Sequence, residues 1–163
     1  MWEGRFITAK REGKWEYVSR SRGIKAAVIL AIDDGHVLLV EQYRVPLGKA
    51  CIELPAGLVG DHDENGDEDS AVAAIRELEE ETGYRAAIME DCGEFYSSPG
   101  MVSESFSLFR AKNLTKIGEG GGVDGEDIIV HRVPLAQLDE FVARKRREGA
   151  GIDVKLLLLL QPR

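Results

Sequence analysis

The chain has 163 residues, of which 44% are hydrophobic and 31% are charged. This length suits a single domain whose core needs neither disulfides nor a structural metal. The formal net charge of −8 disfavours broad binding to nucleic acid. An anionic substrate would need local arginines or bound cations to reverse the field at its site.

The ends of the chain give no sign of a membrane segment. The N-terminus lacks the apolar stretch of a signal peptide, and the leucine run at 156–160 is too short to span a bilayer. Cys51 and Cys92 lie in apolar contexts without metal-ligand spacing, which favours two reduced thiols. We therefore expect a cytoplasmic protein that does not engage membranes.

Strands dominate the first part of the chain. Residues 2–10 and 15–21 are predicted to form two strands around a charged turn, giving an N-terminal β-hairpin. The continuous apolar run at 25–32 is typical of a buried strand. A turn at 33–36 then leads into another strand at 37–43.

A polar loop and a helix follow. A short strand at 51–54 ends at Pro-Ala-Gly, and the acidic stretch 60–69 is predicted to be a loop. The helix is expected at 70–82, with Gly83 as its terminator. Five positions at helical spacing are expected to form its inner face: Ala71, Ala74, Ile75, Leu78 and Thr82.

Further strands are predicted at 86–96, 105–111 and 127–133, with a flexible glycine-rich loop at 118–125. Because strands and helices interleave without strict alternation, we expect an α+β fold with a mixed sheet and helices on its faces.

Two helices are expected near the C-terminus. Pro134 suits the first turn of a helix that ends near Arg147. The apolar segment 153–160 is predicted to be a last helix, with a strand as the alternative.

Four carboxylates lie within five residues of the helix at 70–82. Glu77, Glu80 and Glu81 stand at i, i+3 and i+4, so they share one helix face. Like charges at this spacing destabilise a helix, and a hard divalent cation is the natural compensation. Arg76 can reach Glu79 or Glu80 and hold one carboxylate in place. A solvated acidic face is the alternative for a bare charge run.

This segment resembles the box of the Nudix hydrolase family. That box has a glycine, five residues, a glutamate, seven residues, and then R-E-U-x-E-E-x-G-U, with U a bulky apolar residue. Here Glu68 is followed by seven residues and then by residues 76–84, and every position from Glu68 onward matches. Gly57 best matches the box glycine, which leaves ten residues instead of five before Glu68. We interpret the added length as a longer loop at 58–67, where insertion costs little.

The resemblance implies a metal site. Glu77, Glu80 and Glu81, with the backbone carbonyl of Ala56, would bind two or more Mg²⁺ (or Mn²⁺) ions. These ions would bridge a diphosphate, offset its charge and activate a water for attack on phosphorus.

Other box residues would support this site. Arg76 would orient a glutamate of the catalytic set, to which Glu80 belongs. Glu68 would support the start of the helix, Gly57 would allow close backbone approach, and Gly83 would close the box.

A second phrase resembles the ADP-ribose pyrophosphatase subfamily. Residues 98–104 read SPGMVSE, similar to its SPG-x-x-x-E loop, and Pro99 lies sixteen residues after Gly83, as in that subfamily. The resemblance implies that Glu104 acts as general base or assists a metal. Ser-Pro-Gly taken alone is as typical of an ordinary turn.

A third phrase, QYRVP at 42–46, resembles the QYR-x-P segment of the same subfamily, whose arginine contacts phosphate. The candidate substrate-binding residues are Arg44, Arg22, Glu53 and Pro99. Residues 1–22 resemble a hairpin that mediates a dimer in the subfamily, which implies a homodimer. Trp15 and Tyr17 suit stacking on an adenine, but aromatic strand residues are more often part of a core or an interface.

The resemblance covers nearly all of residues 1–163, taken as one Nudix domain with an α/β/α sandwich and a mixed sheet between helices. It implies hydrolysis of the diphosphate bond of a nucleoside diphosphate sugar, most directly ADP-ribose plus water giving AMP and ribose 5-phosphate. GDP-mannose, another nucleotide sugar or a dinucleoside polyphosphate are alternatives within the same chemistry.

Two other classes compete with an enzyme. A nucleotide-sugar sensor without turnover is disfavoured because every box carboxylate is present. The basic cluster at 144–147 is explained by a solvated helix end that complements the dipole. A purely structural role leaves the clustered glutamates without a purpose.

Overall fold

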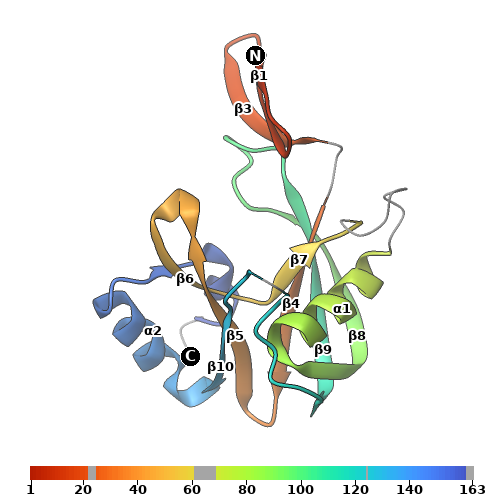
Figure 1. The fold of residues 1–163 in the computed structure, drawn as a ribbon, viewed down its shortest axis with the longest axis vertical. Coiled ribbons are helices and arrows are strands. Elements are labelled where there is room, and N and C mark those ends of the chain that lie inside the picture. The colour runs from red at the N-terminus through yellow and green to blue at the C-terminus, as the bar shows by residue number, and fades with distance from the viewer. Residues whose placement is uncertain (22–24, 61–68, 124, 161–163) are drawn as a thin grey trace.

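The computed structural model describes residues 1–21, 25–60, 69–123 and 125–160. A mixed sheet forms the centre of the molecule, in the order β11-β6-β5-β4-β9-β8, with β10 paired to β5 and β7 to β4 (Figure 1). Its strands are β4 Ala26–Asp33, β5 His36–Arg44, β6 Lys49–Glu53, β7 Ala56–Leu58, β8 Tyr84–Tyr96, β9 Ser105–Lys116, β10 Ile129–Pro134 and β11 Gly151–Ile152.

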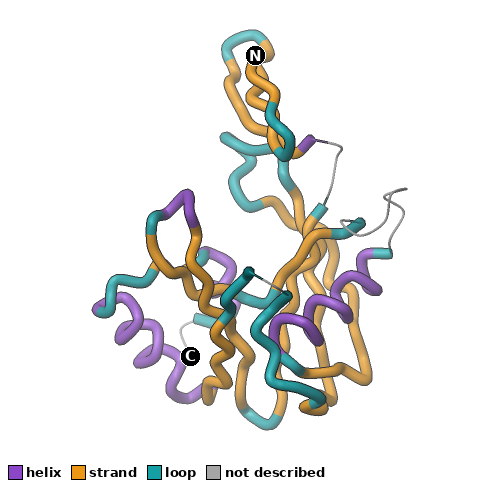
Figure 2. The backbone as a smooth tube through the Cα atoms, in the orientation of Figure 1, coloured by secondary structure: helices purple, strands orange, loops and turns teal. Residues whose placement is uncertain are grey.

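Helices lie on both sides of this sheet, which confirms the expected α+β architecture (Figure 2). The helices are α1 Ser70–Thr82 and α2 Leu138–Arg147, with 3-10 turns η2 Val45–Leu47, η3 Leu135–Gln137 and η4 Val154–Leu158. In the described ranges no helix is long and apolar enough to cross a membrane.

Strand β4 divides the core because its successive side chains face opposite layers. Val28 and Leu30 pack in a buried cluster with the apolar face of α2. Ala27, Ile29 and Ala31 pack in a second cluster with the apolar face of α1. Burial on both sides explains why this strand reads as a continuous apolar run in the sequence.

The N-terminal segment forms a separate three-stranded sheet that projects beyond the central one (Figure 1). Its strands are β1 Trp2–Glu3, β2 Ile7–Glu12 and β3 Trp15–Arg20. The hairpin of β2 and β3 confirms the prediction, but the expected first strand is broken into two. Backbone bonds of 2.9 Å join Val18 to Met101 and Ser103, so this sheet holds the turn that follows β8.

Two predictions near the C-terminus are wrong in part. Pro134 is the last residue of β10 and precedes the 3-10 turn η3, which passes directly into α2 at Leu138; the helical segment ends at Arg147 as expected, but its first turn is a 3-10 turn. The segment 153–160 contains a five-residue 3-10 turn instead of a longer helix. Asp153 caps that turn by accepting a hydrogen bond from the Lys155 amide.

The inner face of α1 also differs from the prediction at one position. Ile75 is 37% exposed, whereas Ala73 is buried. The buried face is rotated so that it also includes Glu81 near the end of the helix. A carboxylate is therefore buried where periodicity alone places apolar residues.

Candidate active site

A cleft of about 520 Å³ forms where α1 and β7 meet β5, β6 and the segments before β9 and β10. Ten charged residues line it: Glu53, Glu77, Glu80, Glu81, Glu104, Glu126, Arg20, Arg44, Arg76 and Lys155. Six carboxylates therefore outnumber four cations. A polyanionic ligand would meet an unfavourable field unless further cations accompany it.

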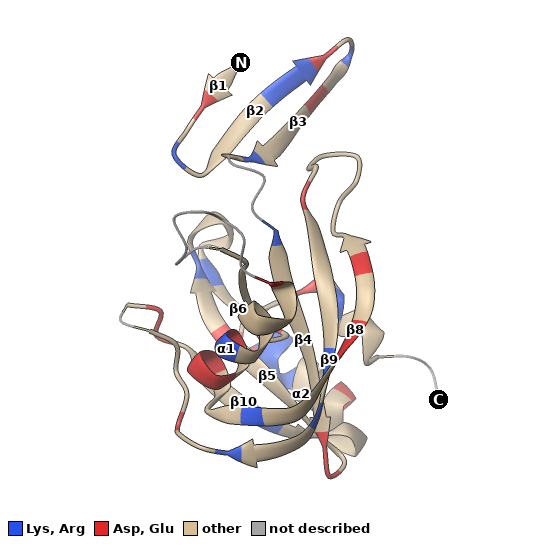
Figure 3. Ribbon diagram, turned by 90° about the vertical axis from the view of Figure 1, so that its right-hand side faces the viewer, with Lys and Arg blue, Asp and Glu red and all other residues tan. Residues whose placement is uncertain are grey.

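One wall of the cleft is the glutamate face of α1, where acidic residues gather (Figure 3). Arg76 holds two of these glutamates, because its Nη1 lies 2.8 Å from Oε1 of Glu77 and 3.2 Å from Oε2 of Glu80. Its Nη2 also donates to the carbonyl of Leu58 at 3.2 Å, which fastens α1 to β7. Glu79, the other expected partner of Arg76, pairs with a different arginine outside the cleft.

Glu81 is the most deeply buried acid of this face, with 5% of its surface exposed. Its Oε2 accepts a hydrogen bond from the backbone N–H of Ala56 at 2.9 Å. Burial raises the pKa of Glu81 to about 8, and the charges of Glu77 and Glu126 act in the same direction. The Ala56 amide and Arg44 offset this only in part. An added cation would therefore find an under-compensated carboxylate here.

Gly57 lets β7 lie directly against the glutamates. A Cβ atom at this position would lie 1.8 Å from the Cδ atom of Glu77. A side chain at this position would have to displace the Glu77 carboxylate, so Gly57 permits the close approach that the sequence suggested.

The glycine-rich loop after β9 caps the end of α1. Gly83 ends the helix with φ +73°, and a Cβ there would lie 2.3 Å from the carbonyl oxygen of Gly118. The N–H groups of Gly121 and Gly122 donate to last-turn carbonyls of α1 at 2.9 and 3.0 Å. This close packing of backbone carries Glu126 into the cleft beside the box glutamates.

The opposite side of the cleft carries a paired arginine. Arg44 on β5 forms a two-pronged ion pair with Glu53 on β6, with Nε–Oε1 at 2.6 Å and Nη2–Oε2 at 2.8 Å. Glu53 is buried, so the pair fixes the guanidinium plane. Hydrogen bonding to Glu53 raises the pKa of Arg44 further, which keeps this group charged.

The N-terminal sheet reaches the cleft through an ion pair between Arg20 on β3 and Glu104, just before β9. Both residues line the cleft. Arg22, the arginine suggested by the sequence, lies outside the described residues.

No three carboxylates converge as a ready-made metal cage within the described part of the chain. The geometry explains this, because Arg76 holds Glu77 and Glu80 while the Ala56 amide holds Glu81. The three glutamates nevertheless line one cleft on one helix face.

The NUDIX domain family model matches residues 22–156, which include the whole cleft apart from Arg20. The chain belongs to the Nudix hydrolase family. The segment from Arg76 to Gly83 lies within the matched residues and fits the Nudix box, and the central sheet with its flanking helices is the Nudix fold.

Curated relatives carry several names. The chain is 42% identical to the methanol dehydrogenase activator of Bacillus methanolicus, over 85% of this chain and 70% of that protein. It is 37% identical to the ADP-ribose pyrophosphatase of Bacillus subtilis, over 63% and 53%. It is 36% identical to the GDP-mannose pyrophosphatase of Cronobacter sakazakii, over 98% and 80%. A solved ADP compounds hydrolase shares the fold, with TM-score 0.65 and 22% identity over 94% of this chain and 89% of that one.

Most residues suggested by the Nudix box and its neighbouring phrases meet in the cleft. Those that line it are Arg44, Glu53, Ala56, Gly57, Arg76, Glu77, Glu80, Glu81 and Glu104. Pro99 lies in an exposed turn and is not among the described residues that line the cleft. Glu68 and most of the lengthened loop before the box lie outside the described ranges.

Several lining residues were not predicted from the sequence, among them Arg20, Gln42, Glu126 and Lys155. Gln42 belongs to the QYRVP phrase, and its Nε2 donates to the carbonyl of Glu126 at 3.3 Å. No sequence motif marks the other three as site residues, and only the tertiary fold brings them to the Nudix box.

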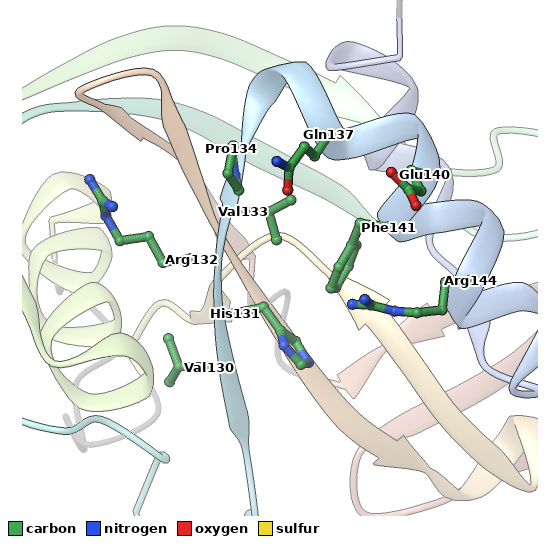
Figure 4. Close-up of a pocket in the computed structure, with 9 residues that line it drawn as sticks. All are labelled: Val130, His131, Arg132, Val133, Pro134, Gln137, Glu140, Phe141 and Arg144. Atoms are coloured by element: carbon green, nitrogen blue, oxygen red, sulfur yellow. The ribbon is translucent and has the colours of Figure 1, made fainter.

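A second hollow, of about 380 Å³, lies between β10 and α2 (Figure 4). Phe141 and Arg144 of α2 point there toward His131 of β10, and the rings of Phe141 and His131 are 5.1 Å apart. Glu140 is the one carboxylate among its described lining residues, and none of them belongs to the Nudix box. Its chemistry does not suit a diphosphate–metal site.

Proposed function

We propose that this chain is a Mg²⁺-dependent (or Mn²⁺-dependent) pyrophosphohydrolase that cuts the diphosphate bond of a nucleoside diphosphate sugar. ADP-ribose is the first candidate, giving AMP and ribose 5-phosphate. The observation that carries the proposal is the meeting of the α1 glutamates, Arg44 and Glu104 in one cleft of a Nudix chain. The similarity to an ADP-ribose pyrophosphatase supports the substrate class.

The donor set of the cleft suits a hard divalent cation. Glu77, Glu80, Glu81 and Glu126 offer carboxylate oxygens, the ligands that Mg²⁺ prefers. Glu81 has no ion-pair partner among the described residues, although it is buried. When bound by these residues, such cations would offset the charge of the diphosphate and supply Lewis-acid catalysis.

The remaining side chains suggest separate tasks. Arg44 retains donors beyond those that bind Glu53, and these can reach a phosphate oxygen. Arg76 keeps Glu77 and Glu80 in register on the helix face. Glu104, oriented by Arg20, is our candidate for the base that takes a proton from the attacking water.

The decisive experiment measures turnover of ADP-ribose, GDP-mannose, other nucleotide sugars and diadenosine polyphosphates, with Mg²⁺ and with chelator. We expect metal-dependent release of AMP from ADP-ribose well above the other reactions. The similarity to a GDP-mannose pyrophosphatase over 98% of the chain also supports GDP-mannose as a substrate. Preference for GDP-mannose would change the assigned substrate but leave the proposed reaction, hydrolysis of a diphosphate bond, unchanged. Binding without turnover of any compound would instead indicate a sensor.

The role of Glu104 has its own test. Replacement by Gln is expected to lower kcat by about 100-fold or more with little change in KM, as for a group that moves a proton in the transition state. Glu94→Gln is the matched comparison, because Glu94 also pairs with a cation, Lys25 at 3.0 Å, but does not line the cleft. A Glu104→Gln effect confined to KM would assign Glu104 to binding.

We further propose a cytoplasmic homodimer of single-domain chains. Large hydrophobic side chains of the N-terminal segment are exposed, among them Trp2, Phe6 and Trp15, and a second copy would cover them. Light scattering of the intact chain measures the mass. A monomer at micromolar concentration would contradict the assembly without touching the chemistry.

A further inference from the structure

Lys155 lies in the cleft but belongs to neither the Nudix box nor the two phrases beside it. It stands in η4, next to the buried Leu156. The Leu156 amide donates to the carbonyl of Asp153 at 3.1 Å, and the Asp153 amide donates to Ile52 of β6 at 3.0 Å. These contacts fix the segment against the central sheet. The Lys155 side chain is only 16% exposed.

Asp153 fixes the ammonium group as well as the backbone of Lys155. One carboxylate oxygen accepts from the Lys155 amide at 2.7 Å, and the other lies 2.7 Å from Nζ. The Nζ atom also lies 5.8 Å from the ring centre of Phe106, which lines the cleft. An ammonium group has three N–H donors, and Asp153 is its one hydrogen-bond acceptor among the described residues. Donors therefore remain for an acceptor in the cleft.

The Lys155–Asp153 pair lies beside the Arg44–Glu53 pair. Strand β11 runs parallel to β6, with Ile152 opposite Ile52, so Asp153 follows next to the end of β6 that carries Glu53. Two cations, each backed by a carboxylate, thus share the side of the cleft formed by β5, β6 and the segment after β11. The box glutamates come from α1, on the other side of the molecule's centre (Figure 1).

We propose that Lys155 is a second phosphate-binding cation of this cleft, which donates to one oxygen of the substrate diphosphate while Arg44 donates to another. This inference rests on the proposed function and adds a residue to it. A diphosphate presents several anionic oxygens, and those turned away from the α1 glutamates need donors from the opposite wall. Lysine serves such oxygens as a point charge. The partial burial of Lys155 against Phe106 strengthens that interaction, because water screens it less.

The test compares Lys155→Met with a matched control, Lys112→Met. Lys112 also forms a lysine–carboxylate pair, with Glu90 at 2.6 Å, but it is 42% exposed and lies outside the cleft lining. Titration calorimetry with ADP and Mg²⁺ measures binding, and steady-state kinetics with ADP-ribose and GDP-mannose measures KM and kcat. Melting temperatures show whether each variant folds.

Lys155→Met is expected to raise Kd for ADP and KM for hydrolysed nucleotide sugars by about 10- to 100-fold, the loss of one charge-assisted bond. The factor should be similar for each nucleotide sugar, since the diphosphate is the shared group. Lys112→Met should change neither constant. If Lys155→Met fails to fold, Lys155→Gln, which keeps a polar end without the charge, decides the question by the same measurements.

Equal constants for Lys155→Met and Lys112→Met, in a protein whose wild type turns over nucleotide sugars, would overturn the inference and leave the proposed function standing. A KM increase for one nucleotide sugar alone, with ADP binding unchanged, would also overturn it, because Lys155 would then contact the sugar or base. A wild type that neither binds ADP nor hydrolyses the panel would overturn the proposed function itself.

Discussion

The two α-helices of the described residues lie on opposite faces of one sheet but distribute charge in opposite ways. Helix α2 has Asp139 and Glu140 in its first turn and four basic residues in its last turn, the arrangement that the helix dipole favours. Helix α1 has no acidic residue in its first turn and gathers its glutamates toward its C-terminal end, where the dipole disfavours them. Charge in α2 thus serves the stability of the helix, whereas charge in α1 opposes it.

Local compensation for α1 comes from its surroundings. The amides of Gly121 and Gly122 satisfy last-turn carbonyls, and Arg76 offsets part of the charge of Glu77 and Glu80. Glu81 has only the Ala56 amide and the more distant charge of Arg44. A sequence that violates a local stability rule in one helix and obeys it in the other points to function in the first.

The largest expected effect comes from removing the charge of Glu81, the least compensated carboxylate of α1. Glu81→Gln should lower kcat/KM with Mg²⁺ by more than about 100-fold, exceeding the 10- to 100-fold losses typical of outer-shell changes at metal sites. The matched control is Glu79→Gln, two residues away on the same helix but paired with Arg85 outside the cleft. Near-normal turnover in Glu81→Gln would show that the negative charge on α1 does not serve catalysis.

The pH dependence of stability sharpens the comparison. In metal-free buffer, the native state keeps a proton on Glu81 up to a pKa of about 8, whereas the unfolded state releases it near 4.5. The contribution of the protonated group to the free energy of unfolding is therefore fully present below about pH 4.5. It is lost as pH rises toward 8, at up to about 1.4 kcal/mol per pH unit. Burial also raises the pKa of Glu77, which acts in the same direction.

Urea unfolding with chelator at about pH 5, 6.5 and 8, within the roughly 4.5–8 window, measures how the free energy of unfolding changes with pH. Glu81→Gln should flatten this dependence, and added Mg²⁺ should stabilise the wild type most at the highest pH. Glu41 has a lowered pKa, because Lys145 and His131 outweigh the effect of its burial, so its contribution changes only below the window. A wild-type slope that survives in Glu81→Gln would assign the pH dependence to another group.

The same contrast explains what the sequence could predict. The bounds of α1 and its glutamate register were predicted from local signals, Gly83 and the spacing of the box, and the structure adds Asp69 as the N-cap. Arg20, Glu126 and Lys155 could not be found that way, because strand pairing and backbone packing bring their segments to the cleft. Ile75 was misplaced for a related reason, since the fold buries Glu81 and rotates the inner face toward it.

The smallest expected effect tests the other helix. Arg147 is exposed in the last turn of α2, where its charge complements the dipole. Arg147→Ala should lower the free energy of unfolding by about 0.3–1 kcal/mol at low ionic strength, and concentrated salt should erase most of the difference. Turnover should be unchanged, because α2 contributes no described residue to the cleft. If Arg147→Ala instead lowered kcat, charge on α2 would also serve the reaction, and the functional contrast between α1 and α2 would be wrong.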